Sequence, residues 1–306
     1  MKVFTAQSVR TIDFLKHSQV ILFCTALVFA GSAGLALYRS QTRGSAFMYS
    51  VDFTGGTQVL LKFDKPTSSH DVKNALEKKG WAGIMTREFP NNELLVRVKA
   101  FENDAYGLGG LIRQAIIDAM PGVDVTILST EAVGPGVGAE LRNKSIHAIL
   151  FSLIALLLYI AVTFWSFSYA IGAVVALIHD SIIMLTFFLL FDRDISITVI
   201  GAILAVLGYS INDTIVIFSR IRTNLKKMPQ VPVAQVINLS INQTLTRTLL
   251  TSFTTLLTVT SMVIFGGEAL RDFSVILLIG IIFGTYSSIF IASPVMLLFY
   301  KQEKAL

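Results

Sequence analysis

Six apolar stretches alternate with polar segments along this chain, and each is a candidate membrane span. They run over residues 18–38, 148–164, 169–191, 195–218, 249–265 and 273–299. A helix needs roughly 20 apolar residues to cross a bilayer, so we expect the second and fifth stretches to extend into the polar residues beside them. Hydrophobic residues make up 53% of the chain, charged residues 15%, and the mean hydropathy is +0.67. These values predict a polytopic α-helical membrane protein with six transmembrane helices.

The long polar segment between the first two spans, residues 39–147, has the pattern of a globular α+β domain. Strand-like alternation is followed by a helical pattern, two strands, a second helical pattern and a last strand, an order typical of a ferredoxin-like fold. The predicted elements are a strand pair at 48–63 around Gly55-Gly56, helices at 67–80 and 103–120, and strands at 84–89, 93–99 and 123–130. The glycine-rich residues 134–138 are expected to form a turn into the second span.

The distribution of Lys and Arg predicts the orientation in the membrane. Basic residues cluster in segment 1–17, in the loop after the fourth span and in the tail 300–306. Short basic loops stay in the cytoplasm, so both termini are expected there and domain 39–147 is expected outside. The net charge of +5 then reflects topology, and no nucleic-acid partner is expected.

The sequence offers no recognisable catalytic machinery. The only cysteine, Cys24, lies in the first span, so domain 39–147 has no disulfide, and its only histidine, His70, has no cluster of metal-ligand residues around it. We therefore expect no covalent catalysis, no cofactor and no metal.

Asp213 is the most informative single residue, because it is the only charged residue in span 195–218. A carboxylate inside a bilayer costs about 2.5–3.5 kcal/mol on insertion scales, so it needs a partner or a task. Arg247, at the head of the next span, is a candidate partner. An acid and a base together favour a proton relay, whose proton affinity changes as the pair forms and separates. A static bridge that sets helix register stays open as the alternative.

Further polar residues in the spans have two interpretations each. Asn212 lies on one face of the fourth span with Gly201 and Gly208, a face suited to a close neighbour. Thr251 belongs to a threonine-rich stripe (residues 244–258) that either lines a hydrated path or only bonds its own helix backbone. The third span contains a polar pair that forms either a secondary relay or a buried packing pair; these residues are His179 and Asp180. The turn at 192–194 has no implied role.

Five motifs, in order along the chain, resemble those of SecF proteins, which belong to the SecD/SecF family of the bacterial Sec translocase and to the RND superfamily of proton-driven transporters. They are VDFTGGTQV (51–59), EAVGPGVGAELRNKSI (131–146), LIHD (177–180), GYSINDTIVIFSRIR (208–222) and TLTRTLLTSFTTLL (244–257). The family's proton-coupling aspartate and arginine fall on Asp213 and Arg247. One departure is Ser219, where many relatives carry an acid before the Arg-x-Arg pair.

The resemblance implies a setting as well as a function. A six-span chain with one external domain is half of an RND-type transporter, so a SecD partner is expected. The implied role is use of the proton-motive force to assist export of preproteins through the SecYEG channel with the ATPase SecA, with YajC and YidC as further candidate partners. The implied location is the bacterial cytoplasmic (inner) membrane. Two rival readings are a small-molecule RND efflux pump and a scaffold that stabilises the translocon without transport.

Overall fold

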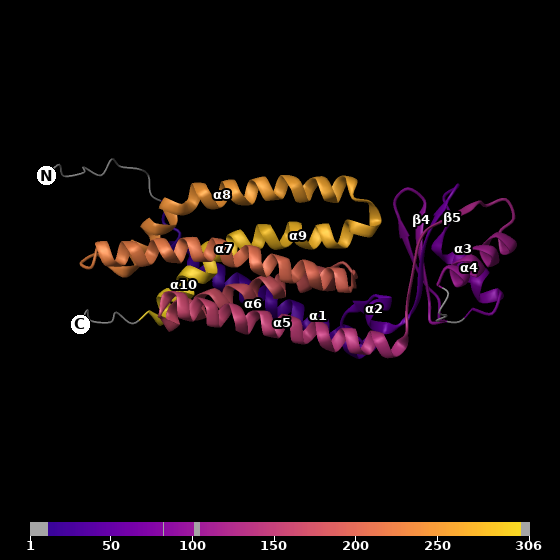
Figure 1. The fold of residues 1–306 in the computed structure, drawn as a ribbon, viewed down its shortest axis with the longest axis horizontal. Coiled ribbons are helices and arrows are strands. Elements are labelled where there is room, and N and C mark those ends of the chain that lie inside the picture. The colour runs from indigo at the N-terminus through magenta and orange to yellow at the C-terminus, as the bar shows by residue number, and fades with distance from the viewer. Residues whose placement is uncertain (1–11, 82, 101–104, 301–306) are drawn as a thin grey trace. The chain divides into compact units, whose positions relative to one another are not determined.

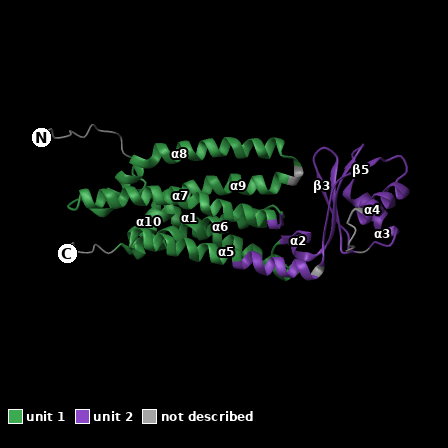
Figure 2. Ribbon diagram, viewed as in Figure 1, with its two compact units in different colours: residues 1–47, 148–193, 198–306 green, residues 48–147, 194–197 purple. Residues whose placement is uncertain are grey.

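The computed structural model describes residues 12–81, 83–100 and 105–300, and it divides into two compact units (Figure 2). Unit 1 comprises residues 1–47, 148–193 and 198–306, and unit 2 comprises residues 48–147 and 194–197. Most of the predicted N-terminal segment and C-terminal tail, and the start of the helix predicted at 103, lie outside the described residues.

Unit 1 is a bundle of long helices that run alongside one another (Figure 1). In the described residues, six helical segments are long and apolar enough to cross a membrane. The elements of this unit, two of which begin in unit 2, are a short 3₁₀ turn (Leu15–His17), α1 (Ser18–Arg43), α5 (Pro135–Phe164), α6 (Phe167–Leu190), α7 (Ile197–Lys227), α8 (Val233–Phe265), α9 (Gly267–Ser287), the π-helical segment η2 (Ser288–Ala292) and α10 (Ser293–Phe299). The chain is thus a multi-pass α-helical membrane protein.

Two helices extend well beyond the apolar stretches that predicted them. α5 begins at Pro135 and α8 at Val233, ahead of the apolar residues at 148 and 249. Their first turns carry polar and charged side chains, so hydropathy does not mark them although the backbone is helical. The second and fifth spans are therefore the ends of longer helices.

The turn predicted at residues 134–138 is wrong, because α5 already starts at Pro135 and continues through these glycines. Proline suits the first residue of a helix, where its missing N–H is not needed. Gly138 allows a close contact in unit 2, since a Cβ there would lie 3.0 Å from Gly55 N and 3.1 Å from the carbonyl carbon of Phe53.

Unit 2 is built on an antiparallel sheet of four strands in the order β3-β4-β2-β5. Two helices connect strands and pack on the sheet. The elements are β2 (Gly56–Phe63), α3 (Ser69–Lys78), β3 (Met85–Phe89), β4 (Glu93–Val98), α4 (Ala105–Ala119) and β5 (Val125–Val133). Strands β2 and β4 and helices α3 and α4 contribute buried apolar side chains to one core. These side chains include Val59, Leu61, Leu76, Leu94, Val96, Ile112 and Ile116. Edge strands β3 and β5 have a strand neighbour on one side only.

The strand pair predicted at 48–63 is only partly correct. Its second half is strand β2, but its first half is β1 (Met48–Tyr49) followed by the short helix α2 (Val51–Thr54). β1 pairs in parallel with β6 (Asp194–Ile195) rather than with β2. Gly56 explains the break: its φ is +111°, and a Cβ would lie 2.5 Å from the carbonyl oxygen of Val98.

The turn at 192–194 has a structural role that its sequence did not indicate. Within unit 2, Asp194 Oδ2 accepts from Nη2 of Arg97 at 3.0 Å and from Nη1 of Arg87 at 3.2 Å. Arg97 also donates to the carbonyl oxygen of Tyr49 at 2.9 Å. These partners lie far apart in sequence, so only the folded chain reveals that Asp194 anchors strand β4.

Candidate functional site

Asp213 lies on the buried face of α7 and is 5% exposed. The buried positions of this helix recur every three or four residues and are apolar as far as Leu207. The same face then becomes polar, with Ser210 and Thr214, each 1% exposed, on either side of Asp213. The sequence therefore places the carboxylate where it faces other helices and not lipid.

The hydroxyl nearest to Asp213 comes from Ser252 of α8. Ser252 Oγ lies 3.5 Å from Asp213 Oδ2 and 2.6 Å from Thr285 Oγ1 of α9. Three helices thus contribute to one polar contact, in which the carboxylate accepts one long hydrogen bond from the described residues. An acid held so weakly can change its protonation state without breaking an extended network.

Arg247 does not form the ion pair that the sequence suggested as a candidate. Among the described residues, no ion pair within 4.0 Å joins it to Asp213, and its side chain is exposed in this chain. At 100° per residue, Arg247 and Ser252 point about 140° apart around α8. Ser252, and not Arg247, is therefore the α8 residue within hydrogen-bond distance of Asp213.

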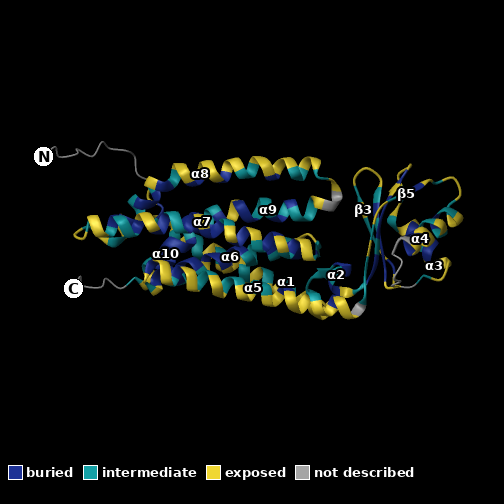
Figure 3. Ribbon diagram, viewed as in Figure 1, coloured by how far each residue is buried: buried dark blue, intermediate teal, exposed yellow. Residues whose placement is uncertain are grey.

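The small-residue face of α7 meets no close neighbour among the residues that the structure describes. A Cβ on Gly201 or Gly208 would find no atom within 4 Å, and Asn212 on the same face is exposed. The outer side of α8 is exposed as well (Figure 3). α7 and α8 therefore present polar residues, including Arg247, on a surface that no other described part of the chain covers.

Several threonines of α8 donate their hydroxyl hydrogens to backbone carbonyl oxygens of the same helix. Thr251 Oγ1 donates to the carbonyl oxygens of Arg247 and Thr248, both at 3.0 Å, and Thr255 donates to that of Thr251 at 2.9 Å. Thr248 differs from these, because its hydroxyl is buried and has no partner among the described residues. The structure therefore favours the backbone-bonding interpretation for Thr251.

A second buried carboxylate, Asp180 of α6, is fully enclosed and has three partners. Oδ2 accepts from Ser210 Oγ at 2.6 Å and from Ser287 Oγ at 2.9 Å, and Oδ1 lies 3.0 Å from Nδ1 of His179. Asp180 is 0% exposed and His179 3% exposed. The predicted pair is thus present as a contact, tied into α7 and α9 by the two serines.

The polar turn at Thr285–Ser288 was missed by the sequence analysis, although it lies between the two carboxylates. Thr285 reaches the Asp213 side through Ser252, Ser287 bonds Asp180, and Ser288 lies 3.0 Å from Thr214 Oγ1. The available signal was a run of hydroxyl residues that interrupts the apolar last span. This run ends in the π-helical segment η2, and such segments often occur at functional sites.

Close packing holds this turn against α6 and α7. A Cβ on Gly284 would lie 3.0 Å from Ser210 Cβ and 3.6 Å from Asp180 Oδ2, and one on Gly280 would lie 2.5 Å from Val206 Cγ1. Glycine at both positions lets the backbone of α9 approach the polar cluster. Within the described part of the chain, no group of three or more His, Cys, Asp or Glu residues is placed to hold a metal ion.

Two buried carboxylates that accept hydrogen bonds from serine hydroxyls of neighbouring helices define a multi-pass membrane protein with a polar centre inside its helical unit. The comparisons with known proteins are specific. Residues 113–302 match the family model described as protein export membrane protein SecD/SecF, C-terminal, and residues 49–67 match the SecD/SecF GG motif. The chain belongs to the SecD/SecF family.

Relatives match over nearly the whole chain. Protein translocase subunit SecF of Desulfurispirillum indicum is 42% identical over 304 residues, covering 96% of this chain and 92% of the relative. The SecF subunit of Calditerrivibrio nitroreducens is 37% identical over 297 residues, covering 96% and 95%. The crystal structure of SecDF from Thermus thermophilus aligns with a TM-score of 0.84 at 32% identity, and covers 97% of this chain but 40% of that one.

Proposed function

We propose that this chain works as the SecF subunit of the Sec protein translocase and couples proton flow to protein export. Its membership of the SecD/SecF family and its similarity to translocase subunits over nearly their full length support this role. The finer assignment, proton coupling through Asp213, rests on the polar centre of the helical unit.

The partner that we propose is SecD. In Thermus thermophilus, a protein named SecDF is 35% identical to this chain over 303 residues, yet the match covers only 39% of it. A single protein thus combines a region like this chain with a longer additional part. The uncovered face of α7 and α8 supports a separate partner here, because Asn212 and Arg247 would be costly against lipid. The chain would then be one half of an RND-type assembly.

The observation that carries the coupling proposal is the contrast between the two buried carboxylates. Asp180 has three close partners, whereas Asp213 has one hydroxyl at 3.5 Å. Protonation of Asp213 therefore disturbs little around it, while protonation of Asp180 weakens the contacts that hold α6, α7 and α9 together. Asp213 suits a proton carrier, and His179–Asp180 suits a secondary relay or a packing pair.

We infer a cycle of proton binding and release from the electrostatics of one acid, Asp213, and one base, Arg247. Ionised Asp213 attracts the guanidinium of Arg247, which requires α8 to turn or shift because the two residues are not paired in this arrangement. Protonated Asp213 removes that attraction and releases α8. Alternation between the two states moves helices in step with proton transfer and needs no covalent catalysis.

The setting of this cycle is the bacterial cytoplasmic membrane. The basic segments support a cytoplasmic position for both termini, on the side of SecA, with unit 2 outside. SecYEG would supply the channel, with YajC and YidC as further candidate neighbours. The strand order β3-β4-β2-β5, with helices α3 and α4 between the strands, supports a ferredoxin-like class for unit 2, whose edge strands could hold an emerging polypeptide by main-chain hydrogen bonds.

The decisive experiment measures export of a secretory precursor into membrane vesicles, with and without a proton gradient. Asp213→Asn should abolish stimulation by the gradient and leave ATP-driven export intact. Asp118→Asn, which changes an exposed carboxylate of unit 2 that faces Lys79, is the matched control and should behave like the unchanged protein. Normal gradient stimulation in Asp213→Asn would overturn the coupling proposal.

A further inference from the structure

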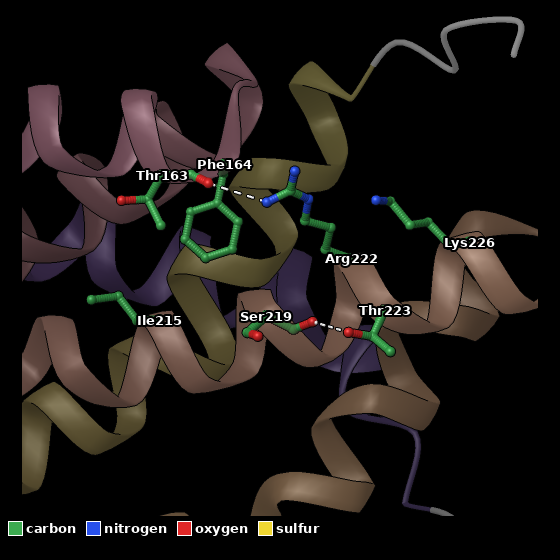
Figure 4. Close-up of a pocket in the computed structure, with 7 residues that line it drawn as sticks. All are labelled: Thr163, Phe164, Ile215, Ser219, Arg222, Thr223 and Lys226. Atoms are coloured by element: carbon green, nitrogen blue, oxygen red, sulfur yellow. Dashed lines mark hydrogen bonds between the residues drawn. The ribbon is translucent and has the colours of Figure 1, made fainter.

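A pocket opens between the end of α5 and the second half of α7 (Figure 4). Its volume is about 430 Å³. The α5 side contributes Thr163 and Phe164, and the α7 side contributes Ser219, Arg222 and Lys226. The pocket therefore combines an apolar floor with hydroxyl and cationic groups.

Among the described residues, no acidic side chain balances the charge of this pocket. Arg222 and Lys226 lie one helical turn apart and extend to the same side of α7 (Figure 4), so their positive charges repel each other. The sequence has no acidic residue between Asp213 and Glu268. In the part of the chain that the structure describes, neither Arg222 nor Lys226 forms an ion pair. An anionic ligand would neutralise both cations.

The donors are arranged for an oxyanion. Arg222 uses Nη1 to bond the carbonyl oxygen of Thr163 at 3.1 Å. This bond fixes the guanidinium at the pocket rim while other N–H groups remain available, and a planar guanidinium binds phosphate oxygens in pairs. The ammonium of Lys226 adds a point charge, and the Ser219 hydroxyl adds a donor.

The surroundings of the pocket point to a ligand with hydrocarbon chains. Phe164 and Ile215 line its apolar side. Tyr159, one turn before Thr163 on α5, is 53% exposed, and Trp165 is 83% exposed. Exposed Tyr and Trp are typical of the boundary between bilayer and water, which places the pocket at the level of lipid headgroups.

We propose that this pocket binds the phosphate headgroup of an anionic phospholipid, with its acyl chains along the exposed apolar side of α5. Basic pockets between transmembrane helices on the cytoplasmic side bind such headgroups in general. The site is separate from Asp213, and its occupancy does not depend on proton coupling or on export.

The test is native mass spectrometry of the full chain in detergent, titrated with phosphatidylglycerol or with phosphatidylcholine of the same acyl chains. Inorganic phosphate is the third probe. Arg222→Gln with Lys226→Gln should weaken phosphatidylglycerol binding about 25-fold, because each cation near a headgroup contributes about the energy of a fivefold change. Arg220→Gln with Lys227→Gln removes the same charge outside the pocket, where Arg220 bonds Gln243, and should retain binding.

A second pair of variants separates the local site from a general effect of charge. Ser219→Asp places a carboxylate beside Arg222 and should abolish the high-affinity lipid adduct, whereas Ser219→Asn should keep it. Equal loss in both double variants would show general surface charge and would overturn the proposal. Equal binding of phosphatidylcholine would show an apolar groove only. Binding of inorganic phosphate as tight as that of phosphatidylglycerol would assign the pocket to a free anion, and the lipid proposal would fail.

Discussion

Ser287 donates its hydroxyl hydrogen to Oδ2 of Asp180 at 2.9 Å, although the two residues are 107 positions apart in the sequence. The contact joins the third span to the last. Asp180 of α6 is a shared acceptor for two other helices, since Ser210 of α7 donates to the same oxygen. A buried acceptor with several donors is costly to remove, because each donor loses its partner.

We expect Ser287→Ala to lower the free energy of unfolding by about 1 kcal/mol and Asp180→Ala by about 3 kcal/mol, since the second change leaves buried donors unpaired. Unfolding in detergent, followed by circular dichroism, measures both. Ser181→Ala is the control, because this hydroxyl bonds only its own backbone at Leu177, and it should be nearly neutral. If Ser181→Ala lowers the free energy of unfolding as much as Ser287→Ala does, the hydrogen bond to Asp180 contributes no more than a bond within one helix.

Export assays on Asp180→Asn then separate relay from packing. A packing residue predicts loss of stability together with loss of all export. A secondary relay predicts normal stability and loss of the gradient-stimulated part alone.

We expect Arg247→Met to keep the stability of the isolated chain, because Arg247 is exposed there and has no ion pair with Asp213. Gradient-stimulated export should nevertheless be lost, since the base that responds to Asp213 is gone. The informative measurement is the double variant with Asp213→Asn, assayed for stability and export together. Export should stay defective; recovery of export in the double variant would show a static bridge.

The exposed face of α7 predicts a selective effect on assembly. Gly208→Leu should leave the isolated chain stable, because no atom lies within 4 Å of the added Cβ, whereas Gly280→Ala should destabilise the chain itself through Val206. Copurification with tagged SecD should fall at least tenfold for Gly208→Leu. Undiminished recovery of SecD would place the partner on another face.

The edge strands of unit 2 predict where a translocating polypeptide is held. Photocrosslinkers at Met85 of β3 and Leu128 of β5, both exposed, should capture a precursor arrested during export. Lys62 is also exposed but lies on the central strand β2, so a probe there should capture much less. Equal capture at all three positions would argue against recognition by strand addition.

Hydropathy and charge along the chain were enough to predict the six-span helical class and the candidate carboxylate. Both depend on properties of short segments: an apolar run of membrane length requires a helix, because its backbone groups must bond within the segment. Asp213 stood out for the same reason, as a lone charge in such a run. The alternation of strand and helix patterns likewise predicted the elements of unit 2 to within a few residues, apart from the first strand pair.

Helix rotation and contact partners were decided by the tertiary structure. Sequence position could not show that Ser252, and not Arg247, faces Asp213, because this depends on how α8 is turned against α7. The turn Thr285–Ser288 is part of the polar centre only because Gly280 and Gly284 allow α9 to approach its neighbours closely. The hydrogen bonds from Arg87 and Arg97 to Asp194 likewise join segments that are distant in the sequence. Local patterns determine which segments cross the bilayer, whereas pairings between side chains depend on the packing of whole helices and strands, which no single segment encodes.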